Sequence, residues 1–264
     1  MKAQTLFDVT GKIAFVTGAA SGLGLAMAEV MAANGAVVTM TDVDPDSLGR
    51  QVDRLKGDGF AVEGRRLDVT DTPALAAAID ATRATHGRLD AVFANAGISA
   101  GPGFKTEAGQ LAAVNRETWD RVLQINLTSV FETVRHAARH MKPQGSGRIV
   151  VTSSIAGLRA ETPCGYAYVA TKAAVANLVR QAALELAPHN VMINAIAPGP
   201  FRTNIAGGNF FKNPDAVPMW SARTPIGRVA EPDELKGLVL LLASPASSYI
   251  TGTVIPIDGG ATAE

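Results

Sequence analysis

The stretch KIAFVTGAASGLGLAMAEVMAANGAVVTMTD, from Lys12 to Asp42, decides the fold of this chain. Its two ends, Lys12–Thr17 and Ala36–Thr41, are short apolar runs typical of buried strands. Between them a glycine-rich turn leads into Gly22–Asn34, where apolar residues recur along one stripe of a helix. A strand, such a turn, a helix and a second strand form a unit that can hold phosphate groups at the helix N-terminus.

The turn itself, TGAASGLG, carries Gly18, Gly22 and Gly24. Glycines permit a tight turn and let the backbone approach an anion closely. A plain strand-to-helix connection has the same local composition, so the motif depends on its context. Here a strand precedes it, a helix follows it, and an acidic residue ends the next strand. The context therefore favours a dinucleotide-binding turn.

That acidic residue is Asp42, within TMTDVD. A carboxylate at this point accepts hydrogen bonds from the adenosine ribose hydroxyls and repels a 2′-phosphate. The alternative is a charge for the N-terminus of the following helix, a place that Asp44 and Asp46 already fill. The turn offers Ser21 just before its second glycine and no arginine. These residues favour NAD over NADP.

Short apolar runs alternate with helical patterns along the rest of the chain, and several of the runs are continuously apolar. This pattern predicts a doubly wound α/β fold with a seven-stranded parallel sheet of the Rossmann type. No linker or repeat divides residues 1–264, so we expect a single domain. The further expected strands are Ala61–Asp68, Leu89–Asn95, Arg148–Ser153, Val191–Ala197 and Thr253–Asp258. The further expected helices are one opened by Thr72 as N-cap with Pro73 next, then Arg116–Met141, Tyr166–Ala187 and Pro232–Ala243.

Two long stretches fit neither a strand nor a helix: Ser99–Val114 and Pro198–Thr224. Each follows a strand, and ligands bind beyond the carboxyl ends of strands in such sheets. We therefore expect both loops to border the site, with the substrate loop at about 198–224. Four large side chains in the second loop are expected either to cover the substrate or to pack the loop onto the core: Phe210, Phe211, Met219 and Trp220.

Composition excludes several classes of protein. Lys plus Arg equals Asp plus Glu, so no basic surplus points to nucleic acid or to an anionic membrane. Nearly half the residues are apolar and 18% are charged, which indicates a large core. Cys164 is the single cysteine, and the four histidines show no ligand spacing, so we expect no disulfide and no metal. The N-terminus lacks the apolar run of a signal peptide, and we expect a cytoplasmic protein.

A phenol and an ammonium group share one helical face in GYAYVATKAAVANL, because Tyr168 and Lys172 are four residues apart. This pair completes a set of motifs. In chain order they are TGAASGLG, NAG at Asn95–Gly97, Asn126 in QINLTS, Ser153–Ser154, the Tyr168–Lys172 pair and Pro198–Gly199. The whole chain thereby resembles the classical short-chain dehydrogenases/reductases, most closely the gluconate 5-dehydrogenase and 3-oxoacyl-carrier-protein reductase types.

The resemblance implies roles for matched residues. It implies a catalytic set of Asn126, Ser154, Tyr168 and Lys172. It implies cofactor contacts from Gly18, Ser21, Gly22, Leu23, Gly24, Asp42, Asp68, Val69, Asn95, Ala96, Gly97, Tyr168, Lys172, Pro198, Gly199 and Thr203. Two features depart from the family pattern: Ala94 replaces the first of two asparagines, and Ser154 lies fourteen residues before Tyr168, one more than is common. Ser153 stays open as the alternative serine.

Two side chains have a second interpretation. Asn126 is expected either to sit in a helix distorted around a proton-relaying water or to be a satisfied buried amide. Cys164 either touches the substrate or only packs. For Tyr168, a free phenol has a pKa of about 10, and lowering it to near 7 takes roughly 4 kcal/mol. Lys172 and the oxidised nicotinamide are expected to supply this free energy against the opposing effect of burial.

The sequence thus predicts an oxidoreductase that transfers a hydride between NAD(H) and a secondary alcohol or ketone, with a polyol or sugar acid as the leading substrate class. A 3-oxoacyl thioester reductase and a non-catalytic dinucleotide-binding sensor or scaffold are the alternatives. Tyr166–Ala187 is apolar nearly all round, and a helix of this kind is buried on more than one side. Together with the resemblance, this predicts a homotetramer.

Overall fold

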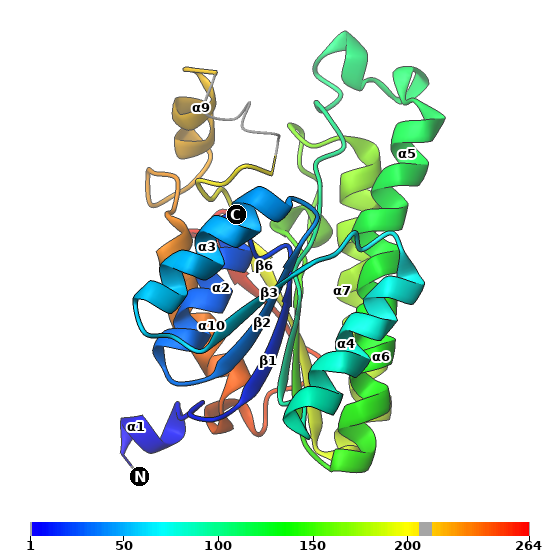
Figure 1. Ribbon diagram of the computed structural model, residues 1–264. Helices are drawn as coiled ribbons and strands as arrows, with labels where there is room; N and C mark the ends of the chain where they lie inside the picture. Colours follow the sequence, from blue (N-terminus) through cyan, green and yellow to red (C-terminus); the bar gives the residue numbers. More distant parts are fainter. Residues whose placement is uncertain (1, 206–212, 264) are drawn as a thin grey trace.

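A seven-stranded parallel sheet forms the centre of the protein (Figure 1). The computed structural model describes residues 2–205 and 213–263. The strands lie in the order β3-β2-β1-β4-β5-β6-β7. Their bounds are β1 Ile13–Thr17, β2 Val37–Asp42, β3 Val62–Arg66, β4 Ala91–Ala94, β5 Gly147–Thr152, β6 Val191–Pro198 and β7 Val254–Ile257. The chain order reverses between β1 and β4, so the fold prediction is confirmed and the switch point lies between these two strands.

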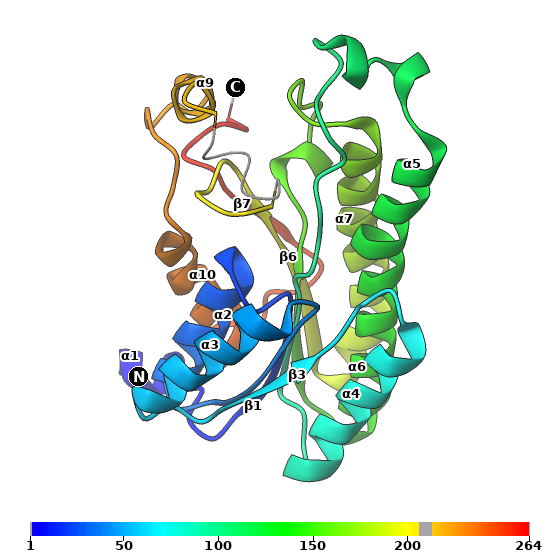
Figure 2. The same cartoon turned by 45° about the horizontal axis from the view of Figure 1, so that its top comes forward.

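Helices cover both faces of the sheet, as Figures 1 and 2 show. One face carries α2 (Gly22–Ala33), α3 (Pro45–Gly57) and α10 (Lys236–Ala243). The other carries α4 (Thr72–His86), α5 (Arg116–Leu123), α6 (Ser129–Gln144) and α7 (Tyr166–Leu186). The two remaining α-helices that the structure describes are short: α1 (Ala3–Leu6) and α9 (Ala216–Ala222). Short 3₁₀ turns occupy Glu107–Gly109, Leu111–Ala113, Ile155–Gly157, Ala187–His189, Pro232–Leu235 and Pro245–Ser247.

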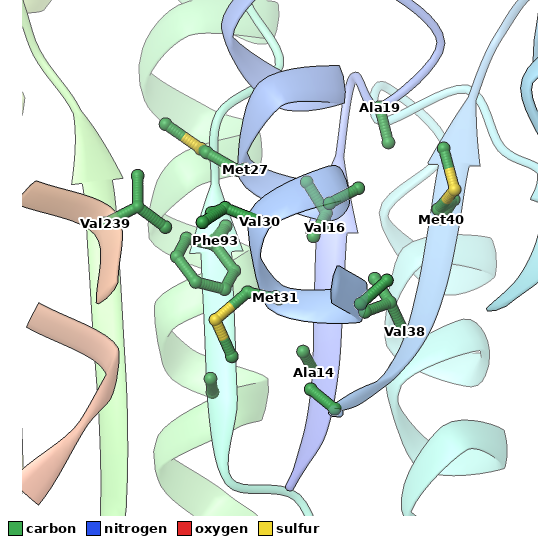
Figure 3. Close-up of a cluster of buried hydrophobic side chains, with 14 of the residues drawn as sticks. Ala14, Val16, Ala19, Met27, Val30, Met31, Val38, Met40, Phe93 and Val239 are labelled. Carbon is green, nitrogen blue, oxygen red and sulfur yellow. The ribbon is translucent and has the colours of Figure 1, made fainter. Parts of the chain in front are cut away.

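Two cores explain why the strands are continuously apolar. Successive side chains of a strand point to opposite faces. In β1, Ala14 and Val16 therefore join the core beneath α2 and α10, while Phe15 joins the core beneath α4, α6 and α7. Figure 3 shows the first core, in which Met27 and Met31 of α2 lie over the sheet. Every residue of β1 is buried, which fixes the strand that leads into the glycine-rich turn.

Two expected helix boundaries are wrong. The N-cap of α4 is Asp71 and not Thr72, because the Asp71 carboxylate accepts a hydrogen bond from the N–H of Ala74 at 3.0 Å. Such a cap holds one of the N–H groups that a helix start leaves free. The helix expected over Arg116–Met141 is divided: α5 and α6 are separated by a π-helical turn at Gln124–Thr128, and α6 continues to Gln144. Asn126 lies in this turn.

The stretch Pro198–Thr224 is more regular than its composition predicts, because it contains α9. Pro218 is the third residue of α9, in the first turn, where a backbone N–H has no partner within the helix in any case. Figure 2 shows α9 and α5 on opposite sides above the same end of the sheet. Phe210 and Phe211, which are expected either to cover the substrate or to pack the loop onto the core, lie outside the described residues.

Candidate active site

The carboxyl ends of β1 and β4 are joined at the switch point by a set of hydrogen bonds. The Thr17 hydroxyl accepts from the N–H groups of Asn95 at 3.0 Å and Ala96 at 3.1 Å. The Asn95 amide nitrogen donates back to the carbonyls of Thr17 at 3.1 Å and Gly18 at 3.2 Å. Its amide oxygen accepts from the Thr152 hydroxyl at 3.0 Å. Asn95 therefore borders the cavity mainly as a brace between strands, and Thr17 and Thr152 are site residues that the sequence did not reveal.

The glycine-rich turn forms a cradle that side chains would fill. Gly18 and Gly22 have φ values of +66° and +55°, in the region that favours glycine. A Cβ atom on Gly24 would lie 2.0 Å from the carbonyl oxygen of Gly18. Helix α2 begins at Gly22, and no side chain caps its first turn, so N–H groups there remain available for an anion. Gly18, Ser21, Gly22 and Leu23 line the adjoining cavity, which fits a pyrophosphate group.

The adenosine end of this cavity is bordered by the acidic residues that the sequence predicts. Asp42, at the end of β2, accepts hydrogen bonds from the N–H groups of Ala20 at 3.0 Å and Asp44 at 3.1 Å. Asp68 and Val69 line the same end. Hydrogen bonds from Thr70 hold the pKa of Asp68 below its ordinary value, so the carboxylate is charged at neutral pH. This end of the cavity therefore presents negative charge.

Tyr168, Ser154 and Lys172 converge at the other end. Tyr168 and Lys172 come from α7, and Ser154 precedes the 3₁₀ turn that follows β5. The Ser154 side chain interacts with the Tyr168 hydroxyl by a hydrogen bond. The Ser153 hydroxyl instead donates to the backbone carbonyl of Lys172 at 2.9 Å and is buried. The geometry thus favours Ser154 over Ser153 as the serine that faces the reacting group.

Burial dominates the protonation of this pair in the protein alone. It raises the pKa of Tyr168 to about 12, while the hydrogen bond from Ser154 acts in the opposite direction. It lowers the pKa of Lys172 to about 8. The Lys172 ammonium donates to the Thr152 carbonyl at 2.8 Å and lies 5.6 Å from the centroid of the Tyr168 ring. The expectation that Lys172 brings the phenol towards a pKa of 7 is therefore not met by this cation on its own.

Asn126 is fully buried, and its amide is satisfied by one backbone unit. Its oxygen accepts from the N–H of Ile98 at 2.8 Å, and its nitrogen donates to the Ile98 carbonyl at 2.8 Å. The predicted helix distortion is present as the π turn. A Cβ atom on Gly97 would lie 3.3 Å from the Asn126 oxygen and 3.6 Å from the Lys172 nitrogen, so glycine keeps the space between them open. A proton-relaying water in this space stays a prediction.

The remaining predicted cofactor contacts lie after β6. Pro198 ends this strand, and a Cβ atom on Gly199 would lie 2.8 Å from the Cα of Asp258. Thr203 lies above the glycine-rich turn, because a Cβ atom on Gly22 would be 3.3 Å from the Thr203 side chain. Pro198, Gly199 and Thr203 line the cavity together with the turn. They are therefore placed between the phosphate cradle and Tyr168.

A cavity of about 1120 Å³ is lined by all the predicted site residues except Gly24 and Asn126. Its wall beyond Tyr168 includes Glu161, Cys164, Met219 and Trp220, none of which the family motifs indicate. Burial and the charge of Glu161 raise the pKa of the Cys164 thiol to about 12, so the thiol is neutral. Since Cys164 lines the cavity, contact with the substrate remains the open alternative to simple packing.

Residues 2–205 and 213–263 contain neither a metal-binding cluster nor a membrane-spanning helix. No group of three His, Cys, Asp or Glu side chains in that part of the chain is arranged to hold a metal ion. None of the helices described there is both long and apolar enough to cross a membrane.

A glycine-lined cavity at the switch point of a doubly wound sheet is the architecture of dinucleotide-binding proteins, and the Ser–Tyr–Lys group beside it adds proton-transfer chemistry typical of oxidoreductases. A family model described as "Enoyl-(Acyl carrier protein) reductase" matches residues 18–262. The chain belongs to the classical short-chain dehydrogenase/reductase family, whose members bind a nicotinamide dinucleotide and act on alcohols or ketones.

Relatives of several substrate types are similar over nearly the whole chain. The cis-4-hydroxycyclohexanecarboxylate dehydrogenase of Sinomonas cyclohexanicum is 41% identical over 96% of this chain and 97% of its own length. The 3-oxoacyl-(acyl-carrier-protein) reductase of Thermotoga maritima is 35% identical over 95% and 97%. A solved gluconate 5-dehydrogenase from Burkholderia cenocepacia, in complex with NADP and tartrate, is 31% identical over 100% of both chains with a TM-score of 0.90.

Proposed function

We propose that this protein is an NAD-dependent dehydrogenase or ketoreductase that transfers a hydride between C4 of the nicotinamide and a secondary carbinol or ketone carbon. The observation that carries the proposal is the position of the Tyr168 hydroxyl beside Ser154, at the end of the cavity opposite the phosphate cradle. A pure binding module has no need of a phenol, a hydroxyl and a buried ammonium at one point. The catalytic set therefore favours an enzyme over a sensor or scaffold.

Each residue has a defined task in this reaction. Ser154 hydrogen-bonds the substrate oxygen and orients it against the Tyr168 hydroxyl. Tyr168 takes the hydroxyl proton during oxidation and returns it during reduction. When bound, the nicotinamide accepts or supplies the hydride, and its oxidised ring adds positive charge.

Electrostatics decides the protonation of the phenol. Because burial alone holds the Tyr168 pKa at about 12, both Lys172 and that ring charge are needed to lower it. Lys172 is fixed for this task by its bond to Thr152. The Asn126 amide holds the backbone of Ile98 in place through two hydrogen bonds.

NAD is the proposed cofactor. Asp42 lines the cavity with its carboxylate held by two backbone N–H groups, and Ser21 supplies no positive charge for a 2′-phosphate. The gluconate 5-dehydrogenase mentioned above was solved with NADP, so the preference needs a direct measurement.

The proposed substrate class is a polyol or sugar acid, which the likeness to that gluconate 5-dehydrogenase supports. The hydroxycyclohexanecarboxylate and 3-oxoacyl relatives make cyclic alcohols and acyl thioesters the other members of a test panel. Steady-state turnover should be measured on sugar acids, polyols, hydroxysteroids and 3-oxoacyl thioesters with both cofactors. Activity confined to thioesters would remove the sugar proposal. Clear NAD binding without any turnover would favour the sensor.

A homotetramer is the proposed assembly. One side of α7 is buried, but its outward side carries Asn177, Arg180 and Gln181 and is less apolar than the sequence suggested. Two large apolar side chains are exposed on this face of the molecule, Leu184 at 75% and Phe131 at 44%. They support an isologous contact between copies of this face. Light scattering tests it, and a monomer at micromolar concentration would refute the proposal.

A further inference from the structure

A buried carboxylate forms part of the cavity wall on the substrate side of Tyr168. Glu161 is 4% exposed and lies in the segment between β5 and α7, the one that is a residue longer than is common in the family. It lines the cavity together with Cys164, which lies between Glu161 and Tyr168 in the sequence. Glu161, Cys164 and Tyr168 all line this cavity, and the charge of Glu161 contributes to the raised pKa of the Cys164 thiol.

Two arginines hold the charge of this carboxylate. Arg159 binds one oxygen through Nε at 3.0 Å, and Arg223 binds the other through a terminal nitrogen at 3.3 Å. Arg223 follows α9 and lies 6.0 Å from the ring of Trp220, which also lines the cavity. Neither arginine is among the described residues that line the cavity. The group nearest to a bound substrate is therefore the carboxylate and not its counter-ions.

The carboxylate has acceptor capacity to spare. Two carboxylate oxygens offer about four lone-pair sites, and the two guanidinium bonds use one on each oxygen. The described residues that line the same cavity include the apolar side chains of Pro163, Ala216 and Met219. A hydroxyl of the substrate can donate to a free site, whereas a carboxylate of the substrate has no proton to donate, and its oxygens would face the oxygens of Glu161.

We propose that Glu161 determines specificity by accepting a hydrogen bond from a second hydroxyl of a neutral substrate and by disfavouring substrates that carry a carboxylate at that point. The inference rests on the proposed function, since it places the reacting carbinol at Tyr168. Within the proposed substrate class it selects polyols or other diols over sugar acids.

A matched pair of probes tests whether the site at Glu161 prefers a hydroxyl to a carboxylate. The probes 4-(hydroxymethyl)cyclohexanol and 4-hydroxycyclohexanecarboxylate share one ring and differ in the distal group. Their dissociation constants are measured calorimetrically on the full-length protein saturated with NAD⁺, which keeps the result separate from turnover. Wild-type protein should bind the diol more tightly than the acid by about tenfold, the factor that about 1.4 kcal/mol from one hydrogen bond gives. Failure of the diol to bind, or equal affinities, overturns the inference.

Two variants each remove one partner of the ion pair between Glu161 and Arg223. Glu161→Gln keeps the size and an acceptor but removes the negative charge, so the preference for the diol should fall by about tenfold. Arg223→Met removes positive charge and leaves the carboxylate, so the preference should hold or increase. If Glu161 only anchored α9, both variants would weaken both probes by the same factor, and that result overturns the inference. Absence of turnover on every alcohol would instead refute the proposed function.

Discussion

Lys172 gives the most quantitative prediction, because its ammonium is charged in a place where burial opposes charge. The side chain is 2% exposed, and burial lowers its pKa from 10.5 to about 8. Between these two values the unfolded chain binds a proton that the folded protein has released. The free energy of unfolding therefore rises with pH through this window. Below about pH 8 the buried ammonium costs about 3 kcal/mol.

The perturbation is Lys172→Met, which removes the titrating group at similar volume. From the same two pKa values, linkage gives wild-type protein a gain of about 2 kcal/mol over the variant between about pH 7 and about pH 9.5. Packing and hydrogen-bond losses in the variant, including the lost bond to the Thr152 carbonyl, do not depend on pH and cancel in this difference. Tyr168 titrates above the window in both proteins.

Urea unfolding of the cofactor-free protein at a series of pH values measures the effect. Lys172→Arg is the matched control, because a guanidinium stays charged throughout and its stability curve should run parallel to that of Lys172→Met. Parallel curves for wild type and Lys172→Met would refute the reasoning, since they would mean that Lys172 does not change its charge within the window.

Two further predictions concern the cofactor. NAD should be preferred over NADP in kcat/KM by about tenfold to a thousandfold. Asp42→Ala should remove most of this preference, whereas Asp46→Ala, at the start of α3 and away from the cavity, should not. Equal use of both cofactors by the wild-type protein would mean that Asp42 does not face the ribose. Gly24→Ala would place a Cβ atom 2.0 Å from the Gly18 carbonyl, so NAD affinity should fall at least about tenfold and stability by about 1–3 kcal/mol. The control Gly49→Ala in α3 meets nothing within 4 Å, so it should leave NAD affinity unchanged and raise stability by about 0.5–1 kcal/mol. Calorimetry and urea unfolding measure both effects, and an unchanged NAD affinity in Gly24→Ala would contradict the cradle.

Much of the fold follows from local pattern. Strands buried on both faces read as continuous apolar runs, and all seven were found within a few residues of their observed bounds. The errors arose where contacts between distant residues or backbone geometry determine the local structure. The π turn at Asn126 leaves no mark in composition, because its cause is the pairing of that amide with Ile98 across the fold. Helix α9 has only seven residues and carries Pro218 in its first turn, so local pattern does not mark it as a helix.

In the candidate site too, local motifs were predictable from the sequence, whereas features that depend on distant contacts were not. Its matched residues, from Gly18 to Thr203, line or border one cavity because most of the motifs follow strands of the same sheet, while Asn126, Tyr168 and Lys172 are brought there by the π turn and α7. The protonation of Tyr168 was not accessible from sequence, since burial depends on every element around the ring. Thr17, Thr152 and Glu161 were missed for a related reason. Their roles rest on partners far away in the chain, such as Asn95 for Thr17 and Arg223 for Glu161.

The central claim is that the Tyr168 hydroxyl carries the proton of an oxidoreductase reaction. Tyr168→Phe keeps the ring and removes the proton carrier, and Tyr166→Phe, at the exposed start of the same helix, is the matched control. On the substrate found in the panel, Tyr168→Phe should fold, bind NAD with nearly wild-type affinity and lose at least about a hundredfold in kcat, while Tyr166→Phe keeps its activity. Near-normal kcat in Tyr168→Phe would contradict the account.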